Sequence, residues 1–387
     1  MPFDYDVDLV ILGAGCAGLS LASKLADAGS PLRVVALEAR SEYVDDRSWC
    51  FWRPEHHDLS HLVSKSWSSW TFAGADGRTS TRSVSGLYYH YVRGSDFYAD
   101  ALRRVAASTS ISIRPGVHVT AVEQVPNGVR IDTDSGAVIA RWVVDTRPQV
   151  LPAMLYQCFA GTEIEVDAPL PFDVDEVGLM TGMRSGADGL GFTYILPLSR
   201  TRAVIEWTRF SAVPLPHAEM VARLDAVLAN LGLGSARVLR HERGVLPMGR
   251  PDVVSDPVPG VVRAGMGGGA LRPTSGYAFL RIQAWAERCA QQLQEGRAPI
   301  GHPAEPWDRR EMDRIFLQAV RAHPEKTADY FLALASRVPP ERLVRFLSDQ
   351  ATPGDYARII ASLPLLPFLA QLPRRPELFH AAGQQAL

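Results

Sequence analysis

Glu206 lies within a run of large apolar side chains, residues 204–210 of the sequence VIEWTRF. A carboxyl among apolar groups keeps its proton to higher pH than one in water, and it can then act as a general acid. Alternation along a strand places Glu206 and Thr208 on one face and Ile205 and Trp207 on the other. The segment therefore fits either an acid enclosed in an apolar cavity or an ordinary strand glutamate facing solvent.

A glycine turn near the start of the chain has the spacing of a dinucleotide-binding unit. Residues 7–12, VDLVIL, resemble a buried strand, and Gly13, Gly15 and Gly18 follow directly, before a stretch with helical apolar spacing. The three glycines permit a tight turn, a close approach to a pyrophosphate and close helix packing. Glu38 ends the next apolar run, where it can accept a hydrogen bond from a ribose hydroxyl. A carboxylate at this position favours a ribose without a 2′-phosphate, and therefore FAD or NAD over NADP.

Two further segments favour FAD. Residues 141–148, RWVVDTRP, are a short strand ending in an acid, as in many two-domain flavoproteins, and residues 263–270, RAGMGGGA, form a second glycine loop before a helix. An ordinary strand end and a structural glycine loop are the alternatives, and Arg47 fits either a flavin contact or an ion pair with Asp45 or Asp46. Besides Gly13, Gly15, Gly18 and Glu38, the expected cofactor contacts are Ala17, Arg47, Val119, Asp145, Gly265, Gly268 and Gly276.

Composition excludes several classes of protein. The 387 residues carry a net charge of −2, so no strong field would recruit nucleic acid. The four cysteines lack metal-ligand spacing, which favours free thiols in a reducing compartment and predicts no metal site. The start of the chain has no export-signal pattern, and no run of about 18 apolar residues occurs that could span a bilayer.

Four segments together resemble the bacterial flavin-dependent lycopene (carotenoid) cyclase family. They are residues 45–52, DDRSWCFW, residues 196–208 with their Ile-Glu-Trp-Thr end, the glycine loop through residue 277, and the last helical stretch from residue 312 to 348. The likeness covers about residues 2–372. Trp207 stands where that family usually has a second acid, and Arg272 where it usually has histidine.

The resemblance implies a reaction and a set of roles. A terminal alkene of an acyclic, lycopene-like polyene is protonated, an internal alkene closes a six-membered ring, and a proton is lost. Reduced FAD is required without net redox change, with NAD(P)H as its reductant. Glu206 would be the general acid, while Trp49, Trp207 and Tyr277 would stabilise the cation through their aromatic faces. The flavin could instead deliver the proton while Glu206 orients it.

The expected fold is α/β: an FAD-binding Rossmann-like two-domain flavoprotein with an antiparallel β substrate domain and a helical C-terminal part. Its FAD-binding domain would be discontinuous, at residues 1–80, 95–155 and 255–300. Residues 81–94 and 156–254 would form the β-rich substrate domain, and residues 301–387 the helical region. A polyene resides in lipid, so we expect a cytoplasmic protein held peripherally on the inner face of the cell membrane.

The apolar tail at residues 359–369, flanked by Arg358, Arg374 and Arg375, is the expected membrane contact, and a core-packed terminal helix is the alternative. The activity has alternatives too. An FAD-dependent monooxygenase or dehydrogenase acting on an apolar terpenoid would share most of these patterns, and so would a carotenoid-binding protein without catalysis. Sequence leaves open the oligomeric state, the ring isomer, and whether one or both ends of the polyene react.

Overall fold

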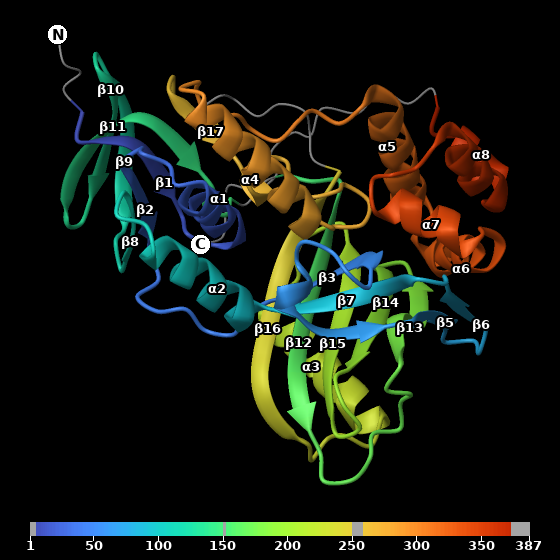
Figure 1. Ribbon diagram of the computed structural model, residues 1–387. Helices are drawn as coiled ribbons and strands as arrows, with labels where there is room; N and C mark the ends of the chain where they lie inside the picture. The colour runs from blue at the N-terminus through green and yellow to red at the C-terminus, as the bar shows by residue number, and fades with distance from the viewer. Residues whose placement is uncertain (1–4, 150–151, 250–257, 373–387) are drawn as a thin grey trace.

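A sheet with parallel central strands contains the predicted dinucleotide-binding unit, and this region is called the nucleotide-binding part below (Figure 1). The computed structural model describes residues 5–149, 152–249 and 258–372. Strand order is β8-β2-β1-β11-β10-β9, with β17 added alongside β11. These strands are β1 (Val7–Leu12), β2 (Val34–Glu38), β8 (Ile111–Pro115), β9 (Val119–Val125), β10 (Gly128–Thr133), β11 (Gly136–Asp145) and β17 (Val261–Arg263). The parallel pairings join β1, β2, β8, β11 and β17, whereas β9 and β10 form an antiparallel hairpin.

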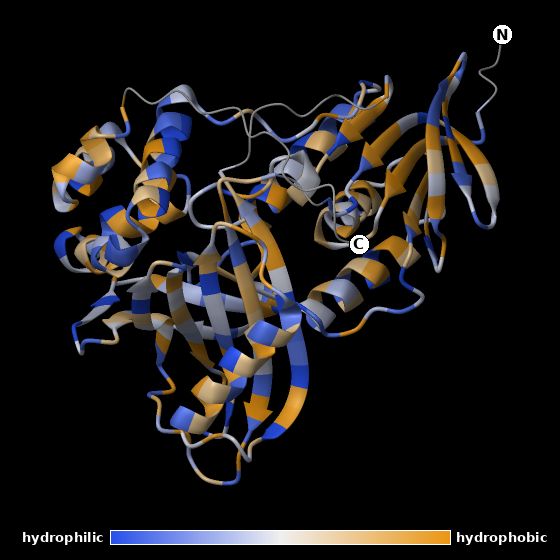
Figure 2. Cartoon of the chain, turned by 180° about the vertical axis from the view of Figure 1, so that it is seen from behind, coloured by the Kyte–Doolittle hydropathy of each residue, from blue (hydrophilic) through white to orange (hydrophobic). Residues whose placement is uncertain are grey.

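Helices pack on one face of this sheet and form its main core. They are α1 (Cys16–Asp27), α2 (Gly94–Ala106) and α4 (Phe279–Gln294). Leu9 and Ile11 face these helices, while Val10 and Leu12 face a second cluster with the β9–β10 hairpin. Because β1 is buried on both faces, its sequence is a continuous apolar run, and Figure 2 shows these strands as predominantly hydrophobic.

A second, largely antiparallel sheet forms the other lobe, in the order β16-β12-β15-β14-β13-β5-β6. Its strands are β5 (Ser69–Gly74), β6 (Thr79–Ser83), β12 (Leu155–Glu165), β13 (Glu176–Gly186), β14 (Gly189–Pro197), β15 (Arg202–Ser211) and β16 (Arg237–Met248). Helix α3 (His217–Asn230) covers one face through residues such as Met220 and Leu224, which pack against Ile205. A smaller sheet of β3 (Ser48–Pro54), β7 (Leu87–Arg93) and β4 (Val63–Trp67) joins the two lobes.

The helical C-terminal part lies against the large antiparallel sheet, on the side away from α3 (Figure 1). It contains α5 (Trp307–Ala322), α6 (Thr327–Arg337), α7 (Pro340–Leu347), α8 (Pro353–Ser362) and α9 (Leu365–Leu369). Single 3₁₀ turns occur at η1 (Ser60–Leu62), η2 (Met266–Gly268) and η3 (Pro324–Lys326). No helix in the described ranges is long and apolar enough to cross a membrane.

The sequence-based domain boundary at residue 80 divides two of the observed sheets. Strands β3 and β4 before it pair with β7 after it, and the hairpin of β5 and β6 is the second case. Strands β5 and β6 pair with each other, and β5 pairs with β13, so residues 69–83 belong to the substrate-side sheet rather than to the first FAD-binding segment. The sequence places this hairpin immediately after the nucleotide unit, and its pairing with a strand about 100 residues later is non-local.

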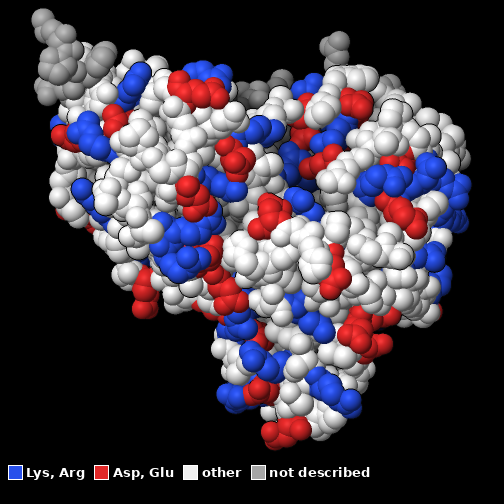
Figure 3. Space-filling model, viewed as in Figure 1, with Lys and Arg blue, Asp and Glu red and all other residues white. Residues whose placement is uncertain are grey.

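Basic and acidic side chains are interspersed on the face shown in Figure 3.

Candidate active site

The first glycine turn forms a cradle at the carboxyl end of β1. Gly13 has φ +84°, and a Cβ on Gly18 would lie 2.1 Å from the Gly13 carbonyl oxygen, so helix α1 can begin this close only with glycine there. Gly15 is the N-cap of α1 and leaves the first-turn N–H groups directed outward. This open helix start is the arrangement that binds a pyrophosphate.

Glu38 lies at the end of β2 and closes one side of this cradle. Its Oε2 accepts the Ala14 N–H at 2.8 Å, and Arg40 donates through Nε and Nη2 at 3.0 and 3.1 Å. Burial opposes ionisation, but the Arg40 and Ala14 bonds outweigh it and lower the pKa of Glu38. The carboxylate is therefore fixed and charged, which suits an acceptor for a ribose hydroxyl.

The second glycine loop meets the first. Gly265 has φ +65°, and a Cβ there would lie 3.1 Å from Ala17, while a Cβ on Gly268 would overlap the Arg263 carbonyl at 2.6 Å. Gly276 also has positive φ, at +70°. Both loops follow parallel strands and lie at the carboxyl edge of the sheet, where open α/β sheets bind ligands. At Gly15, by contrast, a Cβ would meet only Arg40 Nη2, at 4.0 Å, so the space at the start of α1 is open, and the residues fit an FAD pyrophosphate there.

Three other residues predicted to contact the cofactor, Asp145, Arg47 and Val119, have contacts within the protein. Asp145 ends β11 and accepts from the Arg147 backbone and side chain at 2.8–3.1 Å. Arg47 is half exposed and donates to the backbone oxygens of Asp46 and Arg243, so it bridges β3 and β16. Val119 packs in the apolar cluster behind β1.

His302 is a neighbour of the second glycine loop that sequence reasoning missed. Its Nε2 accepts the Gly265 N–H at 3.1 Å, and its ring packs on Trp285. Burial, with the nearby Arg281 and Arg288 charges, lowers the pKa of His302 to about 3, so the ring stays a neutral acceptor. It follows α4 by eight residues and carries no motif that would reveal this role.

Glu206 faces the interior between the sheet and the helical part. Val204 and Phe210, which share its face of β15, belong to the apolar cluster beneath the helices. Thr208 Oγ1 donates to Glu206 Oε1 at 2.7 Å. Burial and then the Glu242 carboxylate raise the pKa of Glu206 to about 8, and the opposing effects of Thr208 and Arg240 are weaker. The surrounding groups enclose the carboxyl, although part of the side chain remains accessible.

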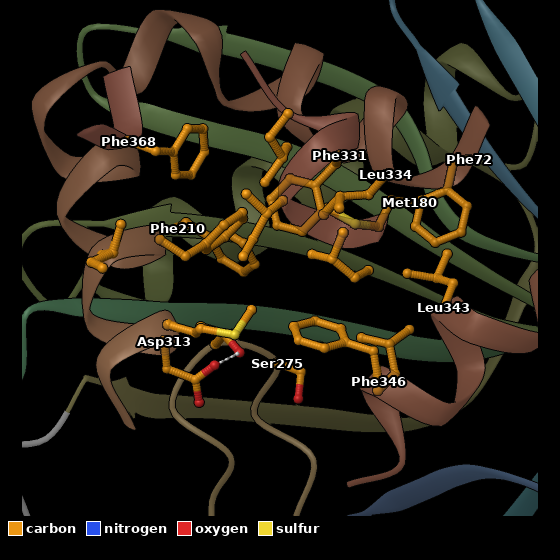
Figure 4. A pocket seen from close by; sticks show the side chains of 18 of the residues that line it. Phe72, Met180, Phe210, Ser275, Asp313, Phe331, Leu334, Leu343, Phe346 and Phe368 are labelled. Atoms are coloured by element: carbon orange, nitrogen blue, oxygen red, sulfur yellow. Dashed lines mark hydrogen bonds between the residues drawn. The ribbon is translucent and has the colours of Figure 1, made fainter. Parts of the chain in front are cut away.

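An apolar cavity of about 320 Å³ lies between the sheet and helices α5–α9, on the side of the sheet that Glu206 faces, and its lining includes neighbours of Glu206 rather than Glu206 itself. Tyr194, the cross-strand neighbour of Glu206 on β14, lines it, and so does Phe210. Figure 4 shows Phe210, Phe331 and Phe346 around the cavity, with Asp313 at its polar edge. At the inner end Tyr277 contacts Trp52 edge to face at 5.6 Å, and its hydroxyl lies 3.3 Å from that of Tyr89.

Two of the three aromatic residues predicted to stabilise the cation, Trp49 and Trp207, do not line this cavity. Trp49 stacks on Phe279 at 5.3 Å in the core of the nucleotide-binding part. Trp207 is on the opposite face of β15 from Glu206 and packs with the α3 cluster. Strand alternation, evident in the sequence, explains this displacement. Tyr277 and Trp52 both line the cavity, and a cation-stabilising role for Tyr277 stays a prediction.

Comparison with known proteins agrees with this architecture. Solved structures with the same fold include a geranylgeranyl bacteriochlorophyll reductase-like protein from Thermoplasma acidophilum, with TM-score 0.57 and 13% identity over 92% of this chain and 96% of that one. The p-nitrophenol 4-monooxygenase PnpA from Pseudomonas putida gives TM-score 0.58 and 15% identity over 94% and 98%. The fold and its glycine cradle therefore define a Rossmann-type flavoprotein, as the sequence predicted.

The family follows from sequence. The model of the lycopene cyclase protein family matches residues 8–372, and the chain belongs to that family. Among its relatives, the lycopene beta-cyclase of Pseudescherichia vulneris is 26% identical over 93% of this chain and 95% of its own length. That of Pantoea ananas is 26% identical over 94% and 97%. The resemblance drawn from the four motifs is thereby confirmed.

Proposed function

We propose that this protein is a lycopene β-cyclase-type carotenoid cyclase, which closes a ring at the acyclic end of a polyene by acid catalysis. One observation carries the proposal. The Glu206 carboxyl, whose pKa is raised to about 8, faces the same side of the sheet as Tyr194 and Phe210, which line an apolar cavity, and at neutral pH it therefore holds a proton that it can give to a hydrocarbon. Relatives named lycopene beta-cyclase across nearly the whole chain support the choice of substrate.

In the proposed reaction, Glu206 carries out both proton transfers and aromatic side chains stabilise the cation between them. Glu206 transfers its proton to the terminal alkene, and the internal alkene then attacks the tertiary cation to form the ring bond. The ring carbon loses a proton to the Glu206 carboxylate, which restores the acid and leaves the product with the mass of the substrate. The faces of Trp52 and Tyr277 stabilise the cation without trapping it. The apolar lining excludes water, which would otherwise add to the cation.

The glycine cradle would hold FAD, and Glu38 would bind its ribose. In its reduced form FAD would supply negative charge that stabilises a cation, and a nicotinamide dinucleotide would serve as its reductant. The proposal needs no change in redox state over one turnover.

The substrate would enter from a bilayer. Leu366 is 80% exposed at α9, and Ile360, Leu365 and Leu369 are about half exposed while also lining the cavity. An exposed apolar rim that continues into an apolar cavity suits a contact with the inner face of the cell membrane, on a cytoplasmic protein. Arg358 lies beside it and donates to the Arg337 carbonyl oxygen, whereas Arg374 and Arg375 lie outside the described residues.

The test is anaerobic incubation of the protein with reduced FAD and lycopene, with products analysed by mass and absorption. A product of unchanged mass and shifted absorption supports cyclisation. In a parallel incubation in air, added oxygen or lost hydrogen would identify a monooxygenase or dehydrogenase, and lycopene that stays unchanged in both incubations would identify a binding protein. Glu206→Gln should abolish turnover while flavin still binds, whereas Glu165→Gln, in the same lobe at an ion pair with Arg237, should retain turnover.

A further inference from the structure

A row of four residues crosses the substrate-side sheet at Glu206. In register, Glu242 of β16 faces Gly161 of β12, Gly161 faces Glu206 of β15, and Glu206 faces Tyr194 of β14. Residues paired in this way point to the same side of a sheet. The row therefore brings two carboxylic acids onto one face with a single glycine between them.

Gly161 makes room for the two acids to approach. A Cβ placed on it would lie 3.0 Å from Glu242 Cγ, 3.2 Å from Glu242 Oε1 and 3.2 Å from Glu206 Cβ. Both glutamate side chains thus occupy the space beside Gly161 that a larger residue's side chain would fill. With any larger residue at position 161, one or both acids would have to shift.

Glu242 is held in place by an ion pair with a buried arginine, Arg240. Arg240 Nη1 donates to Glu242 Oε2 at 3.1 Å, and the other nitrogens of Arg240 donate to Glu163 at 2.8 Å and to Ser48 and Tyr91, each at 2.8 Å. Glu242 is 6% exposed and Arg240 8%. A guanidinium with this many partners is fixed, so the charge on Glu242 has a fixed position too.

We propose that Glu242 is a positioning residue for the cyclisation, because its carboxylate, fixed by Arg240 across Gly161, keeps the proton on Glu206. The inference rests on the proposed function, in which Glu206 is the acid. Two like charges in a poorly solvated site repel, so ionising Glu206 beside Glu242 costs more than burial alone. The same repulsion makes the Glu206 anion a stronger base once it has given up its proton. It then favours recapture of the ring proton, which completes the cycle.

The other titratable groups around Glu206 support this assignment. Cys50 on β3, Tyr194 on β14 and Tyr89 on β7 are enclosed, and burial raises the pKa of each. The same holds for Tyr91 and Tyr277, whose pKa values burial raises to about 12 or beyond. These groups are neutral at working pH. Among the residues that the structure describes, the charges acting on Glu206 are those of Glu242 and Arg240.

The experiment is the pH dependence of cyclisation by FAD-loaded protein. Activity should fall at alkaline pH as Glu206 loses its proton, and Glu242→Gln should move that fall to lower pH by about one unit, since one like charge is removed. Glu242→Asp keeps the charge and should retain the wild-type fall. An unchanged profile in Glu242→Gln would overturn the proposal.

Glu163→Gln is the matched control, because Glu163 also pairs with Arg240 but lies outside the row that contains Glu206. If it shifts the profile as far as Glu242→Gln does, the effect comes from releasing Arg240, and the proposal is wrong. If Glu206→Gln itself remains active, the proposed acid fails instead, so the two failures can be told apart.

A second readout does not depend on turnover. Infrared difference spectra between wild type and Glu206→Gln should show a protonated carboxyl band at neutral pH. That band should disappear at lower pH in Glu242→Gln than in wild type. If Glu242→Gln does not fold, Gly161→Ala provides the comparison, since it separates the acids without removing either. A band that titrates in Gly161→Ala as in wild type would then overturn the proposal.

Discussion

Replacing Glu206 by glutamine should make the stability of the protein less sensitive to pH. In wild type, burial and Glu242 raise the pKa of Glu206 from an ordinary 4.5 to about 8. Between these values the folded state keeps a proton that the unfolded state has released. The free energy of unfolding therefore falls as pH rises through this window, and the contribution is greatest below pH 4.5. Glutamine has nearly the same shape but does not titrate.

The expected size follows from the shift. One pH unit corresponds to about 1.4 kcal/mol, so a group acting alone would change stability by at most roughly 4–5 kcal/mol across the window. Glu206 interacts with Glu242, and protons leave such pairs in shared steps, so we expect about half of this, roughly 2 kcal/mol. Glu206→Gln should therefore gain about 2 kcal/mol relative to wild type on going from acid to alkaline pH.

Urea unfolding followed by tryptophan fluorescence measures this difference, with midpoints compared at about pH 5 and about pH 8.5. Glu165→Gln serves as the control, because its carboxylate pairs with Arg237 and is partly exposed. If wild type and Glu206→Gln lose stability in parallel over this range, Glu206 titrates alike in the folded and unfolded states. The reasoning that makes it an acid at neutral pH would then be refuted.

Three other predictions concern different parts of the molecule. Arg272→Met should destabilise the protein by about 3–5 kcal/mol in urea unfolding, because it leaves the buried Asp313 without its counter-charge, and Arg272→Lys should recover part of the loss. Glu38→Ala should weaken FAD binding at least about tenfold in a flavin fluorescence titration, since it removes a buried hydrogen-bonding group at the cradle. Leu366→Glu should reduce sedimentation with lipid vesicles, whereas Val213→Glu should not, because Val213 is also exposed, at 61% against 80% for Leu366, but follows β15 away from α9; equal behaviour would contradict the membrane contact.

Local sequence predicts the nucleotide-binding part well. The turn at Gly13, the packing that requires glycine at Gly18 and the acid at Glu38 all depend on neighbours within about 25 residues. Their spacing is therefore visible in the sequence. Solved structures of the same fold and the family model confirm the fold class and the family predicted from this spacing together with the other motifs.

Cross-strand contacts explain what sequence did not predict. Glu242 is 36 positions from Glu206 along the chain, and their meeting depends on Gly161 in a third strand. The sequence interpretation left Glu206 as the only acid of its segment, whereas the fold supplies a second one. Alternation along β16, which puts Arg240 and Glu242 on one face, was the available signal. The register that aligns this strand with β12 is set by tertiary packing.

Arg272 connects the second glycine loop to the C-terminal helices. It follows the second glycine loop and forms a two-pronged pair with Asp313 of α5, at 3.0 and 3.1 Å, and a further bond to Asp349 after α7 at 2.6 Å. Hydrogen bonds of Arg272 thus connect the loop that would bind the nucleotide to the helices that cover the apolar cavity. A displacement of the loop would therefore be transmitted through Arg272 to the helices that line the cavity.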